Sequence, residues 1–360
     1  MAELLKNHFF TSQSVNDMTE VIQKFYPEFD TKKFTKLVFD SSFKTLELKA
    51  KMRHTTLCLK KTLPGSYEQA LKILKDSAPY VKGFESMTLP DFVELYGMDY
   101  WDLSLQALRH FTKFSSSEFA IRPYIIKDPE KAMKFMLSCA EDTTKNVRRF
   151  ASEGCRPRLP WAMALPVFKK DPKLITPVLD KLKNDESEFV RRSVANNLND
   201  ISKDNPDIVL DICTKWFGKT ENTDKIIKHA CRSLLKAGNK NALLLFGFAD
   251  PINIKVGNLK LNKEKIKIGE DLFYSFELNV SGNKTNKVRS EYRMDFVKAS
   301  GKLSGKIFQI LQKNYNPGKH LISRKHSFMD HSTRKHYPGI HKITIIINGV
   351  ELAFAVFEVT

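Results

Sequence analysis

The segment from Arg148 to Trp161, RRFASEGCRPRLPW, concentrates side chains that could do chemistry. Within these fourteen residues the chain places one carboxylate, Glu153, among four arginines and a tryptophan. The arginines are Arg148, Arg149, Arg156 and Arg158. Two prolines restrict the backbone of the same segment. A loop that only connects two elements rarely combines so much charge with an aromatic ring, so we expect the segment to hold a charged ligand.

Arginine pairs recur along the chain at a fixed spacing. Val-Arg-Arg at 147–149 is followed 43 residues later by Val-Arg-Arg at 190–192. An Asp-Pro step precedes each triplet, at 128 and at 171, again 43 residues apart. A weaker third copy has Ile-Lys-His at 227–229. This period is typical of helical repeats of the HEAT class, which stack into a solenoid with an extended concave surface.

Stacked repeats would bring the cations of successive copies together. The predicted ladder consists of Arg148, Arg149, Arg191, Arg192 and Lys228. Such a ladder suits the phosphates of a nucleic acid, because each contact adds salt-sensitive affinity that does not depend on base sequence. The alternative is that each arginine pairs with the acidic turn before it, AEDTTK or NDESE. Spacing alone does not separate these two readings.

Composition limits the class of protein. The 360 residues include 59 Lys and Arg against 41 Asp and Glu, and the net charge of +18 indicates an anionic partner such as nucleic acid. With 42% hydrophobic residues the chain can bury a core, which excludes a disordered protein. No apolar run is long enough for a signal peptide or membrane span, so we expect a cytoplasmic protein without membrane contact. Five cysteines without CxxC spacing predict reduced thiols, no metal and no cofactor.

Two different patterns divide the chain. Residues 1–249 show helical periodicity, whereas residues 250–360 consist of short alternating runs bounded by Gly, Asn and Pro. The Asn-Gly step at 348–349 is typical of a tight hairpin turn. We therefore predict a mainly α fold, a HEAT-like α-solenoid followed by an all-β Ig-like sandwich of about seven strands. The Asp-Pro step at 250–251 marks the expected boundary.

The C-terminal part carries the denser positive charge. From residue 250 on it has 19 Lys and Arg against 10 Asp and Glu, a net of +9 in 111 residues. Several of these cations are expected on strand ends and loops, where they could contact a DNA backbone. They are Arg324, Lys325, Arg334 and Lys335.

Three motifs in this order, SSSEFAIRPYI, VRRFASEGCRPRLPWA and VRRSVANNLND, resemble the AlkC branch of the alkylpurine DNA glycosylases, within the HEAT-like repeat DNA alkylation repair superfamily. The resemblance covers about residues 90–250 strongly, and the C-terminal part is similar to the Ig-like domain that some members carry. It implies an enzyme of base excision repair, associated with the bacterial nucleoid. No lysine stands out as a Schiff-base nucleophile, so we expect a monofunctional enzyme, and a monomer on DNA is the simplest arrangement. Its implied substrate is alkylated double-stranded DNA, from which it releases 3-methyladenine and 3-methylcytosine by hydrolysis of the N-glycosidic bond, without extruding the nucleotide.

The resemblance also implies roles for single residues. A base alkylated at N3 is cationic and leaves readily, so the enzyme must stabilise positive charge on the deoxyribose and position a water, and carboxylates serve both purposes. Glu153, Glu118 and Asp200 are the implied acids. Trp161 would face the sugar or the cationic base, and Arg156 would orient an acid or bind a phosphate. Gly154 would permit a sharp turn behind Glu153.

Each of these assignments competes with a structural interpretation. Ser115-x-x-Glu118 fits the capping box of a helix, Trp161 could pack between repeats, and Asp200 could be a surface acid at a helix end. For the whole chain, the competing function is a non-catalytic helical-repeat module that binds nucleic acid or a protein. The direction of the acids separates the two functions, because carboxylates on a phosphate-binding face would only repel the backbone.

Overall fold

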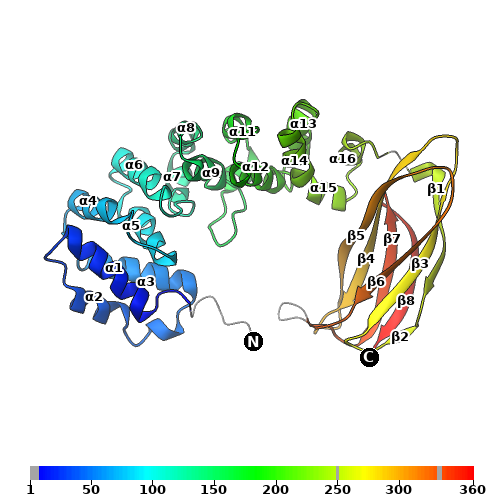
Figure 1. Cartoon of the computed structure of the whole chain (residues 1–360), viewed down its shortest axis with the longest axis horizontal. Coiled ribbons are helices and arrows are strands. Elements are labelled where there is room, and N and C mark those ends of the chain that lie inside the picture. The colour runs from blue at the N-terminus through cyan, green and yellow to red at the C-terminus, as the bar shows by residue number, and fades with distance from the viewer. Residues whose placement is uncertain (1–7, 249–250, 331–334) are drawn as a thin grey trace. The chain divides into compact units, whose positions relative to one another are not determined.

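The computed structural model describes residues 8–248, 251–330 and 335–360, and the chain forms two compact units, residues 1–230 and 231–360 (Figure 1). The first unit is helical and the second is built mainly from strands. The predicted fold class, an α-solenoid followed by an all-β Ig-like sandwich, is confirmed. Two short helices, α15 (Arg232–Lys236) and α16 (Lys240–Leu245), belong to the second unit.

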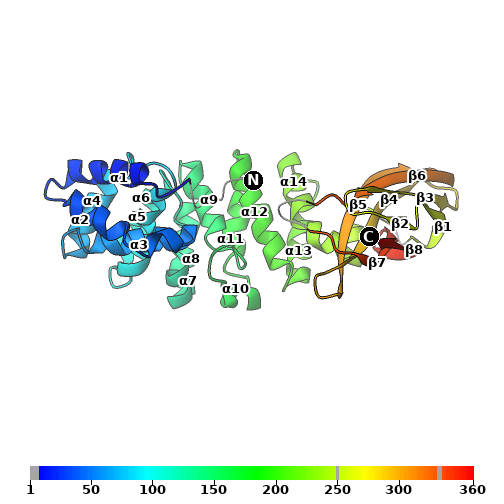
Figure 2. The same ribbon diagram turned by 90° about the horizontal axis from the view of Figure 1, so that it is seen from below.

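Helices of the first unit lie side by side in chain order, each pair packed on the next (Figure 2). They are α1 (Ser12–Phe25), α2 (Thr31–Val38), α3 (Leu48–Lys60), α4 (Tyr67–Ser77), α5 (Thr88–Tyr96), α6 (Trp101–Thr112), α7 (Arg122–Lys127), α8 (Pro129–Cys139), α9 (Lys145–Glu153), α10 (Pro166–Lys170), α11 (Thr176–Leu182), α12 (Glu188–Ile201), α13 (Pro206–Trp216) and α14 (Glu221–Ala230). The valine of each Val-Arg-Arg triplet is fully buried, so the triplets start the second helix of a pair with an apolar anchor.

The two Asp-Pro steps behave differently. Asp128 caps α8, because its carboxylate accepts the Lys131 N–H at 2.9 Å. Asp171, in contrast, does not begin a helix. The Asp171 carboxylate accepts the Lys173 N–H at 3.0 Å and closes a turn, and α11 begins only at Thr176.

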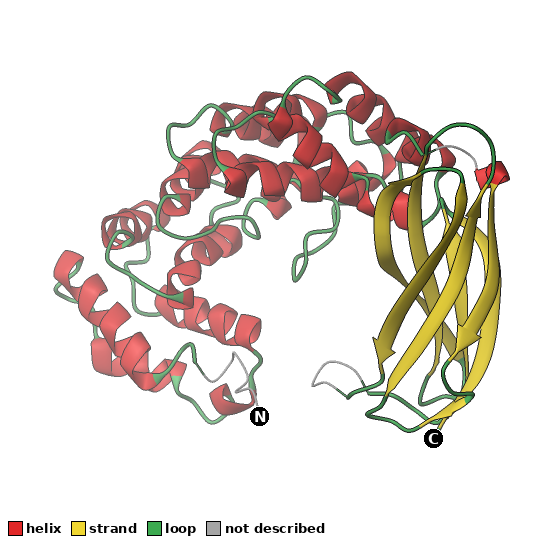
Figure 3. Ribbon diagram, turned by 45° about the vertical axis from the view of Figure 1, so that its right-hand side comes forward, coloured by secondary structure: helices red, strands yellow, loops and turns green. Residues whose placement is uncertain are grey.

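The second unit is a sandwich of two sheets (Figure 3). Its described strands are β1 (Ile254–Leu261), β2 (Lys265–Ile266), β3 (Asp271–Val280), β4 (Asn286–Val297), β5 (Leu303–Tyr315), β6 (Gly318–Ser327), β7 (Gly339–Ile347) and β8 (Val350–Val359). The order β1-β3-β6 forms one sheet and β2-β8-β7-β4-β5 the other. Inward side chains of both sheets form the core, and in β3 they alternate with outward ones as the period of a strand requires.

The predicted hairpin turn is present between β7 and β8. Asn348 and Gly349 have φ of 45° and 80°, the left-handed pair that a tight two-residue hairpin needs. Strand β6 was not predicted, since GKHLISRKHS was interpreted as strand ends and loops. It pairs along its full length with β3 and is an edge strand, where charged side chains limit unwanted pairing.

Candidate active site

Three carboxylates and two guanidiniums form one continuous chain of ion pairs in the first unit. Glu118 pairs with Arg149, whose Nη2 lies 3.2 Å from Glu153 Oε1. Arg156 Nη1 lies 2.7 Å from the same oxygen, and Arg156 Nε lies 2.9 Å from Asp200 Oδ2. The structure therefore brings together the three acids that the sequence singled out. We call this set the acid chain.

Local sequence explains how the acid chain is assembled. Arg149 and Glu153 are four residues apart on α9, so they share one face of that helix, and Arg156 follows three residues later. Asp200 comes from α12, the equivalent helix of the next repeat, which packs directly on α9. Glu118 comes from the turn that precedes α7.

Burial differs along the acid chain. The exposed fraction of the side chain is 4% for Asp200 and 7% for Glu153, but 14% for Glu118. A hydroxyl supports each glutamate: Ser193 Oγ donates to Glu153 and Ser116 Oγ donates to Glu118, both at 2.6 Å. Buried charges are tolerated only when paired and hydrogen-bonded, which every member of this chain is. Glu118 is the acid most open to a ligand.

Arg156 is the centre of the buried half of the acid chain. Burial alone would lower the pKa of its guanidinium, but the charges of Glu153 and Asp200 outweigh that effect and raise it. Arg156 therefore stays cationic and fixes both carboxylates.

Two structural alternatives for the acids are wrong. Helix α7 begins at Arg122 without a side-chain cap, and the Glu118 carboxylate bonds to Ser116 and Arg149 instead of closing a capping box. Asp200 is buried in α12, so it is not a surface acid at a helix end.

Trp161 lies in the loop between α9 and α10, which projects from the helices in Figure 1. Its side chain is 64% exposed, so the alternative of a packed core tryptophan is wrong. Its φ of 64° places it in the left-handed region, which is uncommon for a residue with a side chain. Backbone strain of this kind costs about 1–3 kcal/mol and persists only where the surroundings fix it.

Gly154 does not supply the sharp turn that was predicted for it. Its φ of −63° is helical, and it ends α9. Glycine is required there because a Cβ would lie 2.8 Å from a methyl group of Ile121 and 2.9 Å from that of Met136. Close packing of α9 on neighbouring helices, and not a special dihedral angle, explains this glycine.

Arg122 is a functional candidate that sequence reasoning missed. Its guanidinium is fully buried beneath the loop and donates from Nε to the Met163 carbonyl at 2.7 Å, and from Nη1 to the Gly154 and Arg156 carbonyls at 3.0 Å each. Burial lowers the pKa of Arg122 to about 10, so it is still charged at neutral pH. It joins the two ends of the loop. The letters AIRPYI gave no sign that the arginine points inward.

Lys49 is the second residue that was missed. From the start of α3 its Nζ donates to the Trp161 carbonyl at 2.7 Å, and it lies 4.6 Å from the centre of the Phe119 ring. The contact joins residues 112 positions apart, and nothing in the local pattern around Lys49 announces it. Arg122 and Lys49 thus hold the loop at its base and at its strained tip.

The chain is similar to a described domain family and to proteins of two bacteria. Residues 255–360 match the family described as the C-terminal Ig-like domain of the uncharacterised protein YhaZ. The chain is 43% identical over 350 residues to the uncharacterized protein YhaZ of Bacillus subtilis (strain 168), covering 97% of each chain. It is 36% identical to the Pseudomonas fluorescens alkylpurine DNA glycosylase AlkC, solved bound to DNA containing an abasic site analog. That structure matches 98% of this chain and 99% of its own, with a TM-score of 0.92. The chain belongs to the AlkC family.

In this AlkC family member the predicted ladder of cations needs correction. Arg148 Nε lies 2.6 Å from Asp185 Oδ2, and its Nη1 donates to the carbonyls of residues 142–143. Arg191 donates in the same way to the carbonyls of residues 185–186, one repeat later. Both guanidiniums bond to the acidic turns and brace the repeats, so the alternative interpretation holds for these two arginines.

Other predicted DNA-binding cations of the first unit are at the surface. Arg192 pairs with Glu188 at 2.8 Å, and Arg158 with Asp204 at 2.7 Å. Lys228 is exposed on α14. A groove of about 340 Å³ runs between α12 and α14, with Arg192 in its lining. These side chains remain accessible to an anion.

Cations predicted in the second unit lie on β6 or beside β7. Arg324 and Lys325 are exposed on β6, where Lys325 pairs with Asp271 at 2.6 Å. Lys335 is exposed just before β7. Arg334 lies outside the described residues.

The described ranges of this AlkC family member contain neither a metal-binding cluster nor a membrane-spanning helix. Residues 8–248, 251–330 and 335–360 hold no group of three or more His, Cys, Asp or Glu side chains arranged for a metal ion. In the same part of the chain, no helix combines the length and the apolar character needed to cross a membrane.

Proposed function

We propose that the chain is a monofunctional DNA glycosylase that removes cationic N3-alkylated bases, 3-methyladenine and 3-methylcytosine, from duplex DNA without extruding the nucleotide. Membership of the AlkC family supports the reaction class. The observation that carries the proposal is the convergence of Glu118, Glu153 and Asp200 in the acid chain. A module that only binds phosphates has no use for three carboxylates gathered at one place.

The protein contributes to this reaction mainly by electrostatic stabilisation. When the bond between C1′ and the base nitrogen breaks, both electrons go to the cationic base, which leaves neutral without prior protonation. The deoxyribose becomes an oxocarbenium ion, and a carboxylate beside it lowers the energy of that positive charge. A water then adds to C1′ and gives its proton to a carboxylate, which leaves an abasic site.

The three acids differ in exposure, so we assign them different roles. Glu118 is the most open of the three, and Glu153 shares the Arg149 guanidinium with it, so we assign these two to the sugar and the water. Asp200 is the most buried and contacts Arg156, so it is a positioning residue that acts through that arginine. Trp161 projects from its loop with an open π face, and contact with a cationic base there is worth about 0.5–1 kcal/mol. A neutral base gains less, which favours the alkylated one.

Binding to duplex DNA is proposed for the cations that stay at the surface. In the first unit these are Arg158, Arg192 and Lys228, and in the second Arg324, Lys325 and Lys335, whereas Arg149 belongs to the acid chain. Arg148 and Arg191 stabilise the repeats instead. We propose that the protein acts as a monomer.

The test is release of free methylated bases from alkylated duplex DNA by the purified protein, with Glu153→Gln alongside and no metal added. Release of 3-methyladenine and 3-methylcytosine should collapse in Glu153→Gln while DNA binding is kept. Glu141→Gln is the matched control, because Glu141 is exposed and pairs only at the surface with Lys181. The abasic strand should stay intact, since a monofunctional enzyme does not cleave it.

A different result would identify the other function. If wild type and Glu153→Gln both bind DNA and neither releases a base, the chain is a non-catalytic binding module. Release from both proteins at equal rates would remove Glu153 from the mechanism but keep the reaction.

A further inference from the structure

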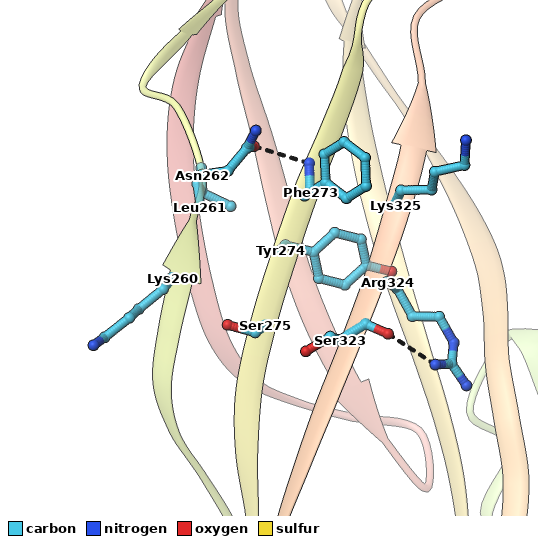
Figure 4. A pocket seen from close by; sticks show the side chains of 9 residues that line it. All are labelled: Lys260, Leu261, Asn262, Phe273, Tyr274, Ser275, Ser323, Arg324 and Lys325. Carbon is cyan, nitrogen blue, oxygen red and sulfur yellow. Dashed lines mark hydrogen bonds between the residues drawn. The ribbon is translucent and has the colours of Figure 1, made fainter.

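A shallow cavity of about 530 Å³ lies on the three-stranded sheet of the second unit (Figure 4). Its lining comes from β1, β3 and β6 and from Asn262, just beyond the end of β1. The acid chain belongs entirely to the other unit, so this cavity is a separate site. The proposed glycosylase function uses Arg324 and Lys325 of its lining as duplex contacts, but it assigns nothing to Lys260 or Phe273.

Strand register arranges the lining in two rows. Lys260 of β1, Ser275 of β3 and Ser323 of β6 are direct cross-strand partners in one row. In the next row Phe273 is the partner of Lys325. The rows are two residues apart along the strand, about 7 Å. In the first row, the short side chains of Ser275 and Ser323 leave open space above the sheet. The Phe273 ring and the lysine side chains lie beside this space.

Phe273 is exposed where a sheet would ordinarily place a polar residue. Half of its side chain, 51%, is open to solvent. Its backbone is nevertheless fixed, because the Phe273 N–H donates to the side-chain oxygen of Asn262 at 2.9 Å and extends the ladder past the end of β1 (Figure 4). The backbone that carries the ring is therefore ordered before a ligand binds.

Three basic side chains line the same cavity as this ring. Among the residues that the structure describes, Lys260 and Arg324 have no carboxylate within ion-pair distance, and Arg324 donates to the adjacent Ser323 carbonyl. Lys325 is paired with Asp271 at the surface. Lys260 and Lys325 share the outward face with Phe273, while Arg324 is the cross-strand partner of the buried Tyr274 and is exposed on the edge strand β6. An aromatic ring on a face with basic side chains matches a ligand that offers both planar rings and a regular row of anions.

We infer that this sheet face binds single-stranded nucleic acid, with an unpaired base stacked on Phe273 and backbone phosphates beside Lys260, Arg324 and Lys325. Stacking platforms flanked by basic side chains are the general means of holding single strands. A paired base in a duplex has both faces covered by its neighbours, so it cannot stack on a ring that is fixed in a sheet. The exposed Phe273 therefore selects unpaired over paired strands, whereas the lysines alone would not.

The experiment measures binding of the full-length protein to a fluorescein-labelled twelve-residue oligothymidine and to a duplex of equal length, by fluorescence anisotropy. Phe273→Ala should weaken binding of the single strand roughly tenfold or more, the loss expected for one stacked base, and leave duplex binding unchanged. Lys260→Ala should reduce the slope of log affinity against log salt by about 0.7 for the single strand.

Phe354→Ala is the matched control. Phe354 is another exposed aromatic, 66% open, on β8 of the other sheet, with Lys342 at 4.6 Å from its ring centre. This variant should bind the single strand like wild type. Thermal melting of each variant confirms folding, which replacement of a half-exposed ring should not disturb.

Two outcomes would overturn the inference. Single-strand affinity that is unchanged in Phe273→Ala means that the ring holds no base. Equal losses of affinity for the single strand and the duplex mean that this face contacts only the backbone of the DNA. Base release is measured separately on the same proteins, so a failure of the glycosylase proposal would show as absent release and would leave this binding result standing.

Discussion

Lys49 should control the rate of base release although it lies on α3, far from the acid chain in sequence. Its ammonium bonds to the Trp161 carbonyl at 2.7 Å, and Trp161 is held in a left-handed conformation. Lys49→Met keeps the length of the side chain and removes the donor. The loop then loses the contact that holds its tip.

The size of the effect follows from two free energies of similar magnitude. A hydrogen bond to a charged donor contributes about 1.5 kcal/mol at the lower end of its range, the end that suits a partly exposed lysine. The left-handed backbone of Trp161 costs about 1–3 kcal/mol. Removing the hydrogen bond therefore loses about as much free energy as the left-handed conformation of Trp161 costs. A change of about 1.4 kcal/mol is tenfold in population, so we expect single-turnover base release to fall by up to about tenfold.

The assay compares single-turnover release with DNA affinity for Lys49→Met, Lys49→Arg and Lys44→Met. Release should fall in Lys49→Met at unchanged affinity and recover in Lys49→Arg, whose guanidinium still donates to a carbonyl. Lys44 is an exposed lysine of the same region and serves as the control. Labelling with 5-fluorotryptophan gives a readout that does not need activity, because the Trp161 resonance should shift or broaden in Lys49→Met alone.

A double-mutant cycle decides whether Lys49 acts through the tryptophan. In the Trp161→Ala background, Lys49→Met should cause no further loss of release. A full additional loss there would refute the reasoning and indicate that Lys49 contributes by a direct charge effect. An unchanged fluorine spectrum together with a reduced rate would refute it as well.

Other residues give further predictions. Arg148→Ala should lower the free energy of unfolding by about 3 kcal/mol, because it leaves the buried carboxylate of Asp185 without its ion-pair partner. Arg192→Ala should change the free energy of unfolding by less than about 0.5 kcal/mol. Urea denaturation compares the two variants. Arg192→Ala should instead lower the salt slope of duplex binding by about 0.9, and an unchanged slope would exclude a phosphate contact. Arg122→Met should destabilise the protein by about 3 kcal/mol in the same denaturation, because three loop carbonyls lose their donor, and a smaller loss would mean that water replaces it. Burial lowers the pKa of His341 in the folded protein. The neutral imidazole therefore stabilises the fold above about pH 6.5, and this stability is lost as pH falls through the folded-state pKa. The melting temperature of His341→Gln should depend less on pH in that range than that of wild type, and equal slopes would contradict this assignment.

The resemblance to the AlkC branch singled out the acids, and the stacked repeats explain why two of them meet. Glu153 and Asp200 follow their Val-Arg-Arg triplets on equivalent helices, so stacking of α9 and α12 brings them within reach of one arginine. The sequence pattern could not distinguish the role of Arg148 from that of its neighbour Arg149. Consecutive side chains on a helix point about 100° apart, so one reaches the acidic turn and the other the acid chain. Which arginine faces which acid depends on helix phase, and a triplet of letters does not state it.

Other features were missed because they have no local signature. The contact of Lys49 with Trp161 spans 112 positions and exists only because the first helices pack near the loop. Strand β6 was missed for a different reason: Ser323, Arg324 and Lys325 interrupt its alternation of exposed and buried side chains. An edge strand tolerates such a run because one of its sides pairs with no neighbour.

The arginines of the acid chain resolve a conflict between binding and catalysis. Carboxylates at the surface of a DNA-binding protein repel phosphates, but catalysis of this reaction needs them near the sugar. Three carboxylates are balanced by Arg149, Arg156 and Lys203, whose Nζ lies 3.2 Å from Asp200 Oδ1, so the set is formally neutral. A phosphate at some distance meets no net charge there. A sugar in direct contact with Glu118, the most open acid, meets a negative oxygen at close range, where Coulomb attraction is strongest. In the proposed reaction, stabilisation therefore appears mainly when positive charge develops on the sugar, and DNA binding is assigned to the exposed cations elsewhere.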